Sequence, residues 1–352
     1  MPKAPNKNAE KKSKSAVSDA DPPQASSADD AEQPRHETSV VTGASGRFGK
    51  ELIRMLIKRG DTIRALVKRR EMIIELPSGV IPYIGDINDT KVLNDAIAGA
   101  DNVFHLAAIV SAYDNPTEEV IRVNVDGTRN VLDACEKHGI KHFIFTSSHE
   151  VYGSKRKEVL DENSRLMPND KYGYSKMLAE GVIERYRQTV PFTIFRMATL
   201  YGPSFEGSFF KIFRILKEQK AYIIGSGKNH LALLHVYDAL QAFVLAKGSP
   251  SSMGKIYNLS DGEAYTQEHL LGLAADMLGV PRPTRHMNEL IVKLIAKERG
   301  FDSNEFRFLT SNRILDISKV KSEIGFNPSV SMQRGGMELI EEFKRRGAAK
   351  AK

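Results

Sequence analysis

Short apolar runs alternate with amphipathic segments from residue 38 to residue 196, and this alternation is the feature that most constrains the fold. Runs rich in apolar and β-branched residues predict strands at 38–42, 62–67, 80–84, 102–106, 142–147 and 192–196. Apolar residues at helical spacing predict helices at 51–59, 92–97, 117–137 and 172–188. Strand–helix units of this length form a parallel sheet with helices on both faces. We therefore expect an α/β fold with a doubly wound parallel sheet.

The alternation loosens beyond residue 202, which indicates a smaller C-terminal domain. Helices are predicted at 209–218, 236–246, 267–278 and 290–298, and strands at 221–224 and 255–259. The expected organisation is a Rossmann-type domain at 37–202 to which 229–260 return, a substrate-binding lobe made of 203–228 and 261–343, and a basic tail at 344–352. Residues 1–36 hold Val17 as their only large branched apolar residue, so we expect a disordered tail there.

The net charge of +7 is concentrated at the C-terminal end of the chain. The last ten residues contribute +5 and residues 1–36 are neutral, which leaves only +2 for residues 37–342. A nearly balanced body argues against a nucleic-acid partner.

The chain contains a single cysteine, which excludes an internal disulfide and a cysteine metal cluster. We expect no metal site. No apolar run reaches the roughly 18 residues that span a bilayer, and the N-terminus lacks the apolar core of a secretory signal. These features predict a cytoplasmic protein with no membrane partner.

A glycine-rich turn lies between the first predicted strand and the first predicted helix, as Thr-Gly-Ala-Ser-Gly-Arg-Phe-Gly at residues 42–49. Gly43 permits a tight turn, Gly46 lets the backbone approach a pyrophosphate, and Gly49 allows the helix to pack closely on the sheet. The positive end of the helix then attracts the anion. This context predicts a dinucleotide cofactor contacted by Gly43, Ser45, Gly46, Arg47, Phe48 and Gly49.

The end of the second predicted strand decides which dinucleotide is favoured. An NAD-binding protein usually places an acid there for the ribose 2′-hydroxyl, but residues 65–70 contain none. Lys68 and Arg69, together with Arg47, suit a 2′-phosphate instead, so the sequence favours NADP(H). NAD(H) remains the alternative if these cations are only solvated. Asp86 and Ile87 follow the third strand and are placed to meet the adenine, unless Asp86 simply belongs to a turn.

Tyr172 and Lys176 lie four residues apart on one predicted helix and therefore share a face. A neighbouring ammonium favours the phenolate of a tyrosine, which suits proton transfer to or from an alcohol. Tyr174 is only two residues from Lys176 and points elsewhere. The sequence therefore predicts a catalytic Tyr172–Lys176 pair.

The glycine turn and Tyr172-x-x-x-Lys176 together resemble the extended short-chain dehydrogenase/reductases, a family of epimerases, dehydratases and hydroxysteroid-type dehydrogenases. The resemblance covers residues 38 to about 343, and further motifs follow in the family order: Gly85-Asp86-Ile87, His105-Leu106-Ala107-Ala108, Asn124-Val125-Asp126-Gly127-Thr128, Thr146-Ser147-Ser148, Val151-Tyr152-Gly153, Tyr201-Gly202-Pro203 and His235-Val236-Tyr237-Asp238.

The resemblance assigns roles to individual residues. It implies that Ser148 holds the substrate oxygen, that Tyr172 is the acid or base, and that Lys176 binds the nicotinamide ribose. Ser147 competes with Ser148 for this role, but adjacent strand residues face opposite sides, so only one serves. The resemblance also implies the cofactor or site residues Leu106, Ala107, Asn124 and Thr199, and a homodimer formed through the two long helices.

Three positions bear on the branch of the family. Glu150 follows Ser148 by two residues, where sugar-nucleotide dehydratases and some decarboxylases carry a glutamate, so it is a candidate additional base; a polar residue at the mouth of the site is the alternative. Thr199 stands where many sugar-nucleotide enzymes have Asn, and Leu231 where they have a diphosphate-binding Arg. These two positions resemble the hydroxysteroid and dihydroflavonol reductase branch, although Lys228 or His230 can substitute for the missing arginine.

The sequence thus favours an NAD(P)-dependent oxidoreductase that interconverts a ketone and a secondary alcohol of a small-molecule substrate. The alternative is a nucleotide-sugar epimerase or dehydratase that uses Ser148, Tyr172 and Lys176 with Glu150 as an additional base. A cofactor-sensing regulator without turnover is disfavoured, because a sensor has no need of Tyr172 and Lys176. The apolar cluster Leu290, Ile291, Leu294 and Ile295 is interpreted as helix packing.

Overall fold

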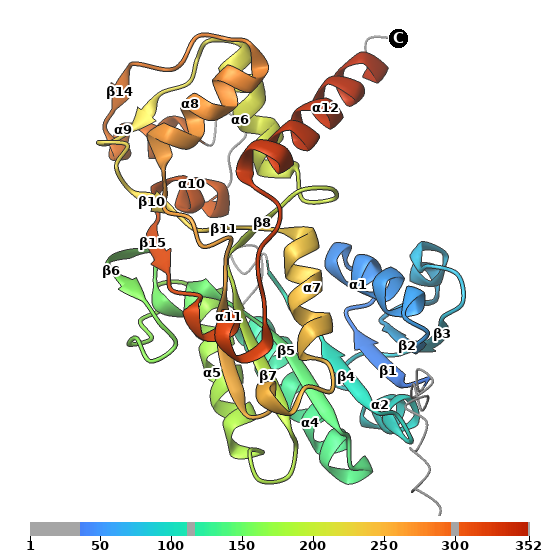
Figure 1. Ribbon diagram of the computed structural model, residues 1–352. Coiled ribbons are helices and arrows are strands. Elements are labelled where there is room, and N and C mark those ends of the chain that lie inside the picture. Colours follow the sequence, from blue (N-terminus) through green and yellow to red (C-terminus); the bar gives the residue numbers. More distant parts are fainter. Residues whose placement is uncertain (1–35, 111–116, 297–302, 351–352) are drawn as a thin grey trace, which may run out of the picture. The chain divides into compact units, whose positions relative to one another are not determined.

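The computed structural model describes residues 36–110, 117–296 and 303–350. Seven strands form one sheet: β1 (Thr38–Thr42), β2 (Thr62–Val67), β3 (Ile81–Ile84), β4 (Asn102–His105), β5 (His142–Ser148), β7 (Phe192–Met197) and β12 (Lys255–Leu259). Their order across the sheet is β3-β2-β1-β4-β5-β7-β12, and every neighbouring pair is parallel (Figure 1). This is the Rossmann-type doubly wound sheet that the sequence predicts.

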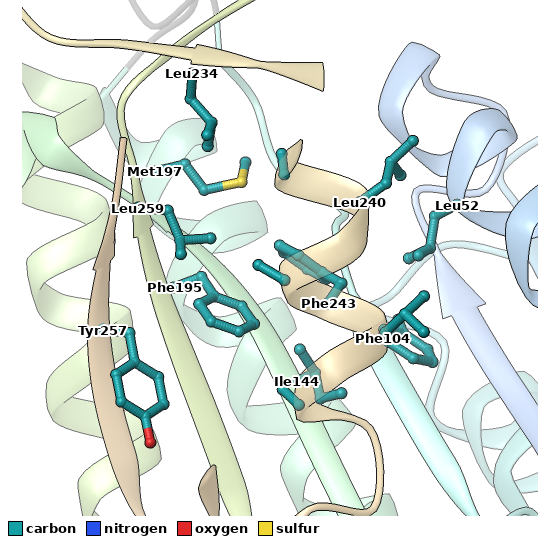
Figure 2. Packing of buried hydrophobic residues seen from close by; sticks show 14 of the residues in the cluster. Leu52, Phe104, Ile144, Phe195, Met197, Leu234, Leu240, Phe243, Tyr257 and Leu259 are labelled. Atoms are coloured by element: carbon teal, nitrogen blue, oxygen red, sulfur yellow. The ribbon is translucent and has the colours of Figure 1, made fainter. Parts of the chain in front are cut away.

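Helices cover both faces of the sheet because its central strands are apolar on both sides. One face packs against α1 (Arg47–Lys58) and α7 (Val236–Ala246). The other packs against α2 (Thr90–Ile97), α4 (Gly127–His138) and α5 (Lys171–Arg185). Figure 2 shows the first of these cores, where Phe243 of α7 lies over Phe104, Ile144 and Phe195 of the sheet. Adjacent residues such as Phe143 and Ile144 belong to opposite cores, as strand alternation requires.

The long helix predicted at 117–137 is divided into α3 (Thr117–Ile121), a π-helical segment at Arg122–Asp126, and α4. It ends at Gly139, whose left-handed backbone (φ 63°) is tolerated by glycine at a helix C-terminus. π-helical turns such as Arg122–Asp126 are frequent at functional sites, and this one contains Asn124.

The remaining helices and short strand pairs lie mostly beyond residue 198. The helices are α6 (Gly207–Lys217), α8 (Gln267–Leu278), α9 (Glu289–Ala296), α10 (Ser303–Thr310), α11 (Ser318–Ile324) and α12 (Met332–Lys350). The paired strands are β8 (Thr199–Tyr201) with β11 (Leu233–His235), β9 (Ile223–Ile224) with β14 (His286–Met287), β10 (His230–Leu231) with β13 (Tyr265–Thr266), and β6 (Lys155–Leu160) with β15 (Asn312–Leu315). α6, α8 and α12 share a third apolar core, centred on Phe213, Leu270 and Ile340.

At the two predicted tails and the β6–β15 strand pair, the sequence predictions and the described structure do not fully coincide. The disordered tail predicted at 1–36 lies outside the described residues except for His36. α12 extends through Lys350, so most of the predicted basic tail is helical. The β6–β15 pair has no counterpart among the predicted elements, because β6 is a charged edge segment (Lys-Arg-Lys-Glu-Val-Leu) without apolar alternation.

Candidate active site

The glycine turn has the geometry that a dinucleotide requires. Gly43 has a positive φ of 68°, and a Cβ atom there would lie 2.7 Å from the backbone nitrogen of Ala107. A Cβ on Gly49 would collide with the Gly43 carbonyl oxygen, so the close approach of α1 to β1 requires glycine. A side chain at either position would therefore force the backbone of the turn to shift, and the turn's amides would lose the positions from which they could bind an anion.

A groove of about 580 Å³ opens above this turn, at the carboxyl ends of β1, β2 and β4. Of the residues predicted to contact the cofactor, eleven line it: Gly43, Ser45, Gly46, Arg47, Phe48, Gly49, Lys68, Asp86, Ile87, Leu106 and Ala107. A groove of this volume and position fits a dinucleotide.

The cations that favoured NADP(H) in the sequence have other partners in the structure. Lys68 forms an ion pair with Asp86 (Nζ–Oδ2 3.2 Å). Burial alone would raise the pKa of Asp86, but hydrogen bonds from Asn88 and Lys68 lower it below its ordinary value. The guanidinium of Arg47 donates to the Ser204 carbonyl oxygen at 3.0 Å and stacks on Phe205.

Arg69 is exposed and is not one of the groove residues in the described chain. A 2′-phosphate would therefore have to displace existing contacts of Lys68 and Arg47. The preference for NADP(H) has no support in this geometry.

Buried polar residues fix the floor of the groove. His105 is fully buried, with Nδ1 2.7 Å from Thr42 Oγ1 and Nε2 3.0 Å from Thr128 Oγ1. Burial lowers the pKa of His105 to about 3, so the ring is neutral. Its two hydrogen bonds connect β1 to α4.

Asn124 joins the groove to the helix that carries the catalytic pair. Its side chain accepts a hydrogen bond from Ile109 N (2.7 Å) and donates to Ile109 O (3.0 Å) and to Ser175 Oγ (2.9 Å). Ser175 in turn donates to the Tyr172 carbonyl oxygen at 2.8 Å. Because Ile109 lines the groove, these bonds place α5 beside it, and Asn124 supports the site without lining the groove.

Ser148, Tyr172 and Lys176 converge where β5 ends. The Ser148 side chain lies near enough to the Tyr172 hydroxyl to lower the pKa of Tyr172. Lys176 is 1% exposed, and its Nζ donates to the Thr146 carbonyl oxygen at 2.7 Å and lies 5.9 Å from the centre of the Tyr172 ring. Tyr174 is half exposed and turned away, as predicted. The structure therefore brings the three predicted residues together.

The pKa values show how this trio is charged. Burial raises the pKa of Tyr172 well above its ordinary value, and the carboxylates of Glu150 and Asp170 raise it further, against the hydrogen bond from Ser148. Burial also lowers the pKa of Lys176 to about 7, although Glu180 opposes the decrease. Tyr172 is thus a phenol at neutral pH, rather than the phenolate expected from its lysine neighbour.

Ser147, the competitor of Ser148, is used elsewhere. Its hydroxyl donates to Glu180 Oε1 at 2.5 Å on the other face of β5. Glu180 is paired with buried Arg196 (2.7 Å), whose guanidinium also donates to Tyr152 Oη at 2.8 Å. This buried network leaves Ser148 as the serine that faces Tyr172.

Glu150 lies in the turn after Ser148, but its carboxylate is already paired. Arg313, which is 1% exposed, donates from Nη1 to Glu150 Oε1 at 3.1 Å and from Nη2 to Oε2 at 2.6 Å. Burial would raise the pKa of Glu150, yet several opposing effects, of which the charge of Arg313 is the largest, together outweigh burial and hold that pKa at about 2. A carboxylate with so low a pKa is a weak base, which argues against the predicted role as additional base.

Arg313 holds the rest of this turn as well. It also donates to the Gly153 carbonyl oxygen and lies 3.0 Å from His149 Nε2. Burial, followed by the charge of Arg313, lowers the pKa of His149 to about 3, so the ring is neutral and accepts this hydrogen bond. The Glu150 amide donates to Ser148 Oγ at 3.2 Å, which connects the Glu150–Arg313 pair to the predicted catalytic serine.

A second arginine reaches the same region. Arg307 of α10 pairs with Asp170, the residue that caps α5 by accepting a hydrogen bond from Gly173 N at 2.9 Å. Arg307 Nε also lies 3.9 Å from Glu150 Oε2. Arg307, Arg313 and Asp170 are not among the residues that the sequence predicts for the site; of the three, only Asp170 carries a local signal, as an Asp just before a helix.

Two other predicted positions lie apart from the groove. The Thr199 amide donates to the Ala232 carbonyl oxygen at 3.3 Å, and Thr199 is not one of the groove residues in the described chain. Leu231 is buried in β10, while Lys228 and His230 border a separate depression beside β6. Within the described ranges, no cluster of three His, Cys, Asp or Glu side chains suits a metal ion, and no helix is long and apolar enough to cross a membrane.

A doubly wound sheet with a glycine-cradled groove and a Ser–Tyr–Lys trio defines the class of NAD(P)-dependent enzymes with the extended short-chain dehydrogenase/reductase architecture. Residues 39–260 match the model of the NAD dependent epimerase/dehydratase family. The chain belongs to this family.

Several of the proteins that this chain resembles are named for reactions on sugar substrates. The chain is 28% identical over 315 residues to N-acetyl-alpha-D-glucosaminyl-diphospho-ditrans,octacis-undecaprenol 4-epimerase of Escherichia coli O157:H7, covering 85% of this chain and 93% of the relative. It is 30% identical over 327 residues to UDP-N-acetyl-alpha-D-glucosaminuronate decarboxylase of Bacillus cytotoxicus, covering 87% and 97%. UDP-glucose 4-epimerase of Thermotoga maritima, solved with UDP-glucose, shares the fold with a TM-score of 0.73 at 23% identity, over 88% of this chain and 99% of that one.

Proposed function

We propose that this enzyme is a sugar epimerase or dehydratase that acts on a diphosphate-linked sugar with NAD as its cofactor. The observation that carries the proposal is the convergence of Ser148, Tyr172 and Lys176 at the end of β5, which Asn124 connects to the groove through Ile109 and Ser175. The family match and the relatives support this reading over the simple ketone reductase that the sequence favoured.

The residues of the groove and of the trio would hold the cofactor. The glycine turn would receive the pyrophosphate, and Asp86 and Ile87 the adenosine end. Lys176, which does not line the groove in the described chain, would bind the nicotinamide ribose. When bound there, NAD supplies a hydride acceptor that can also return the hydride. We propose NAD rather than NADP because Lys68 is neutralised by Asp86 and because the family description names NAD.

The chain's own groups then move the proton. Ser148 orients the reacting sugar hydroxyl, and Tyr172 exchanges a proton with that oxygen as the alcohol and ketone interconvert. When the ketone is reduced, negative charge develops on its oxygen, and that oxygen can then take a proton from a phenol with a raised pKa. Protonated Tyr172 therefore suits the reductive half of the reaction. The oxidative half needs the phenolate. Burial and the charges of Glu150 and Asp170 oppose that form, and Lys176 can counteract them only while it is protonated.

Glu150 is not proposed as a base, because Arg313 occupies both of its oxygens. We propose that Glu150 and Arg313 instead hold the turn that follows Ser148. The homodimer through α4 and α5 and the cytoplasmic location remain predictions.

A reductase that consumes NADH on a less charged ketone is the second candidate, and one observation favours it. Leu231 stands buried where a diphosphate-binding arginine is expected, so no guanidinium is present at that position. Incubation with UDP-glucose and UDP-N-acetylglucosamine, and separately with a panel of ketones and NADH, tests both candidates. Stoichiometric loss of NADH with a ketone, without conversion of any sugar substrate, would overturn the proposal.

A further inference from the structure

α9 exposes apolar side chains on the face that it turns away from the lobe. Leu290 is 73% exposed, Ile291 51% and Leu294 77%. Leu290 and Leu294 are one helical turn apart, so they lie side by side on the same face. Figure 1 shows α9 at the edge of the lobe, beside β14.

The interpretation of Leu290, Ile291, Leu294 and Ile295 as helix packing is wrong for the first three, which are exposed; of the four, only Ile295 lies on the inner face of α9. Val292 and Ile295 line an apolar pocket together with Phe306 and Leu309 of α10. A surface helix is normally polar on its outer face, whereas α9 is apolar on both. The outer leucines are therefore not needed to hold the helix on the lobe, and a clustered exposed apolar patch indicates a contact with something else.

Positive side chains surround this patch. Lys293 is exposed on α9 itself, and Arg285 is exposed just before β14, which leads into α9. Lys157 and Lys228 border a depression of about 510 Å³ that also contains Glu289, the first residue of α9. Among the ion pairs of the described residues, none involves these four cations.

The acids in that depression are already neutralised. Glu289 pairs with Lys155 at 2.8 Å, and Glu158 pairs with Arg156. The patch is therefore apolar at its centre and positively charged around it.

We propose that α9 docks this enzyme on an anionic lipid surface. Leu290, Ile291 and Leu294 enter the headgroup boundary, and Lys293 and Arg285 contact lipid phosphates, the arrangement of a helix that lies in the interface plane. A second copy of the chain fits the patch less well. A two-fold contact through α9 would bring these cations against their own copies, and like charges repel.

The docked helix is connected to the catalytic region through α10. α10 packs against the inner face of α9 through Phe306 and Leu309, and the intervening Arg307 pairs with Asp170 at the start of the catalytic helix. The inference concerns where the enzyme works and does not depend on which reaction it catalyses.

Co-sedimentation of the full chain with vesicles tests the inference. The protein is expected to bind phosphatidylcholine vesicles that contain phosphatidylglycerol, and to bind pure phosphatidylcholine vesicles weakly. The double variant Leu290→Ser/Leu294→Ser should reduce the partition coefficient by about tenfold or more, given the transfer free energy of two leucines. Lys293→Glu should weaken binding and reduce its dependence on salt. Ile74→Ser, which removes an exposed apolar residue elsewhere, is the matched control and should bind normally.

Circular dichroism and activity on a water-soluble substrate should be unchanged in the double variant, because the leucines are exposed. Equal vesicle binding by the double variant and the wild type would overturn the proposal, and so would a wild type that binds neither kind of vesicle. If the wild type instead forms an oligomer and the double variant is monomeric, the occupant of the patch is a second copy of the chain and the proposal is wrong.

Discussion

Replacing Arg313 by methionine should destabilise the enzyme substantially, because it leaves the buried Glu150 carboxylate without its bidentate partner. The pKa of Glu150 lies at about 2 in the folded protein and at 4.5 ordinarily. Since one pH unit is worth about 1.4 kcal/mol, ionisation of Glu150 in its folded surroundings stabilises the folded state by about 3 kcal/mol at neutral pH, and Arg313 is the largest of the favourable contributions. Breaking a buried pair typically costs about 3–5 kcal/mol, which agrees with this magnitude.

The lowered pKa of Glu150 also sets the sign of the pH dependence of stability. A carboxylate with a lowered folded-state pKa contributes its full stabilisation above its ordinary pKa of 4.5, and loses it as the pH falls towards 2. The difference between wild type and Arg313→Met should therefore be largest at neutral pH and should shrink in acid.

Urea unfolding at pH 7 and pH 4 measures this difference directly. Glu150→Gln/Arg313→Met, which removes both charges, should recover part of the lost stability. Arg54→Met is the matched control, because it breaks an exposed pair with Glu51 and should change the free energy of unfolding by less than about 0.5 kcal/mol. If Arg313→Met lowers the free energy of unfolding by as little as the control does, the stabilising role of the Glu150–Arg313 pair is refuted.

The remaining predictions concern the catalytic trio and the cofactor. Ser148→Ala should reduce kcat strongly with normal cofactor affinity, whereas Ser147→Ala should mainly lower stability, since its hydroxyl bonds to Glu180; equal effects on kcat would contradict the assignment. Gly49→Val should abolish cofactor binding in a fluorescence titration, because a side chain collides with the turn. Because burial lowers the pKa of Lys176 to about 7, the wild type should gain stability between pH 7 and pH 9, where the unfolded chain binds the additional proton; Lys176→Met should lack that gain and lose turnover. Titration should show tighter binding of NADH than of NADPH, and a clear NADPH preference would restore the sequence-based assignment to Lys68.

The sequence predicted the sheet well because each strand carries its own local signal. The strands at 38–42 and 62–67 are found with the predicted bounds, since apolar runs buried on both faces are bounded by turn residues. β6 and β15 were missed because they pair across a long sequence separation and only the packed chain brings them together. The division of the long helix around Asn124 was also missed, because a π-helical turn has no simple periodic pattern.

The same distinction applies to the site. The glycine turn and Tyr172-x-x-x-Lys176 are local motifs, so the sequence identified them. Arg313 and Arg307 act on residues more than a hundred positions away, and their partners could not be found from spacing. The predictions of Glu150 as a base and of Lys68 as a phosphate ligand could not take these partners into account, although a charged residue's role depends on the partner that the fold provides.

The most direct test of the proposed function is proton NMR of UDP-glucose and UDP-N-acetylglucosamine incubated with the enzyme and NAD, with NADH absorbance recorded in parallel. The account predicts conversion of a sugar substrate without net accumulation of NADH, since the hydride is returned, and no conversion by Tyr172→Phe, which should still bind the cofactor. Undiminished conversion by Tyr172→Phe, or stoichiometric formation of NADH with an oxidised sugar as the final product, would contradict it.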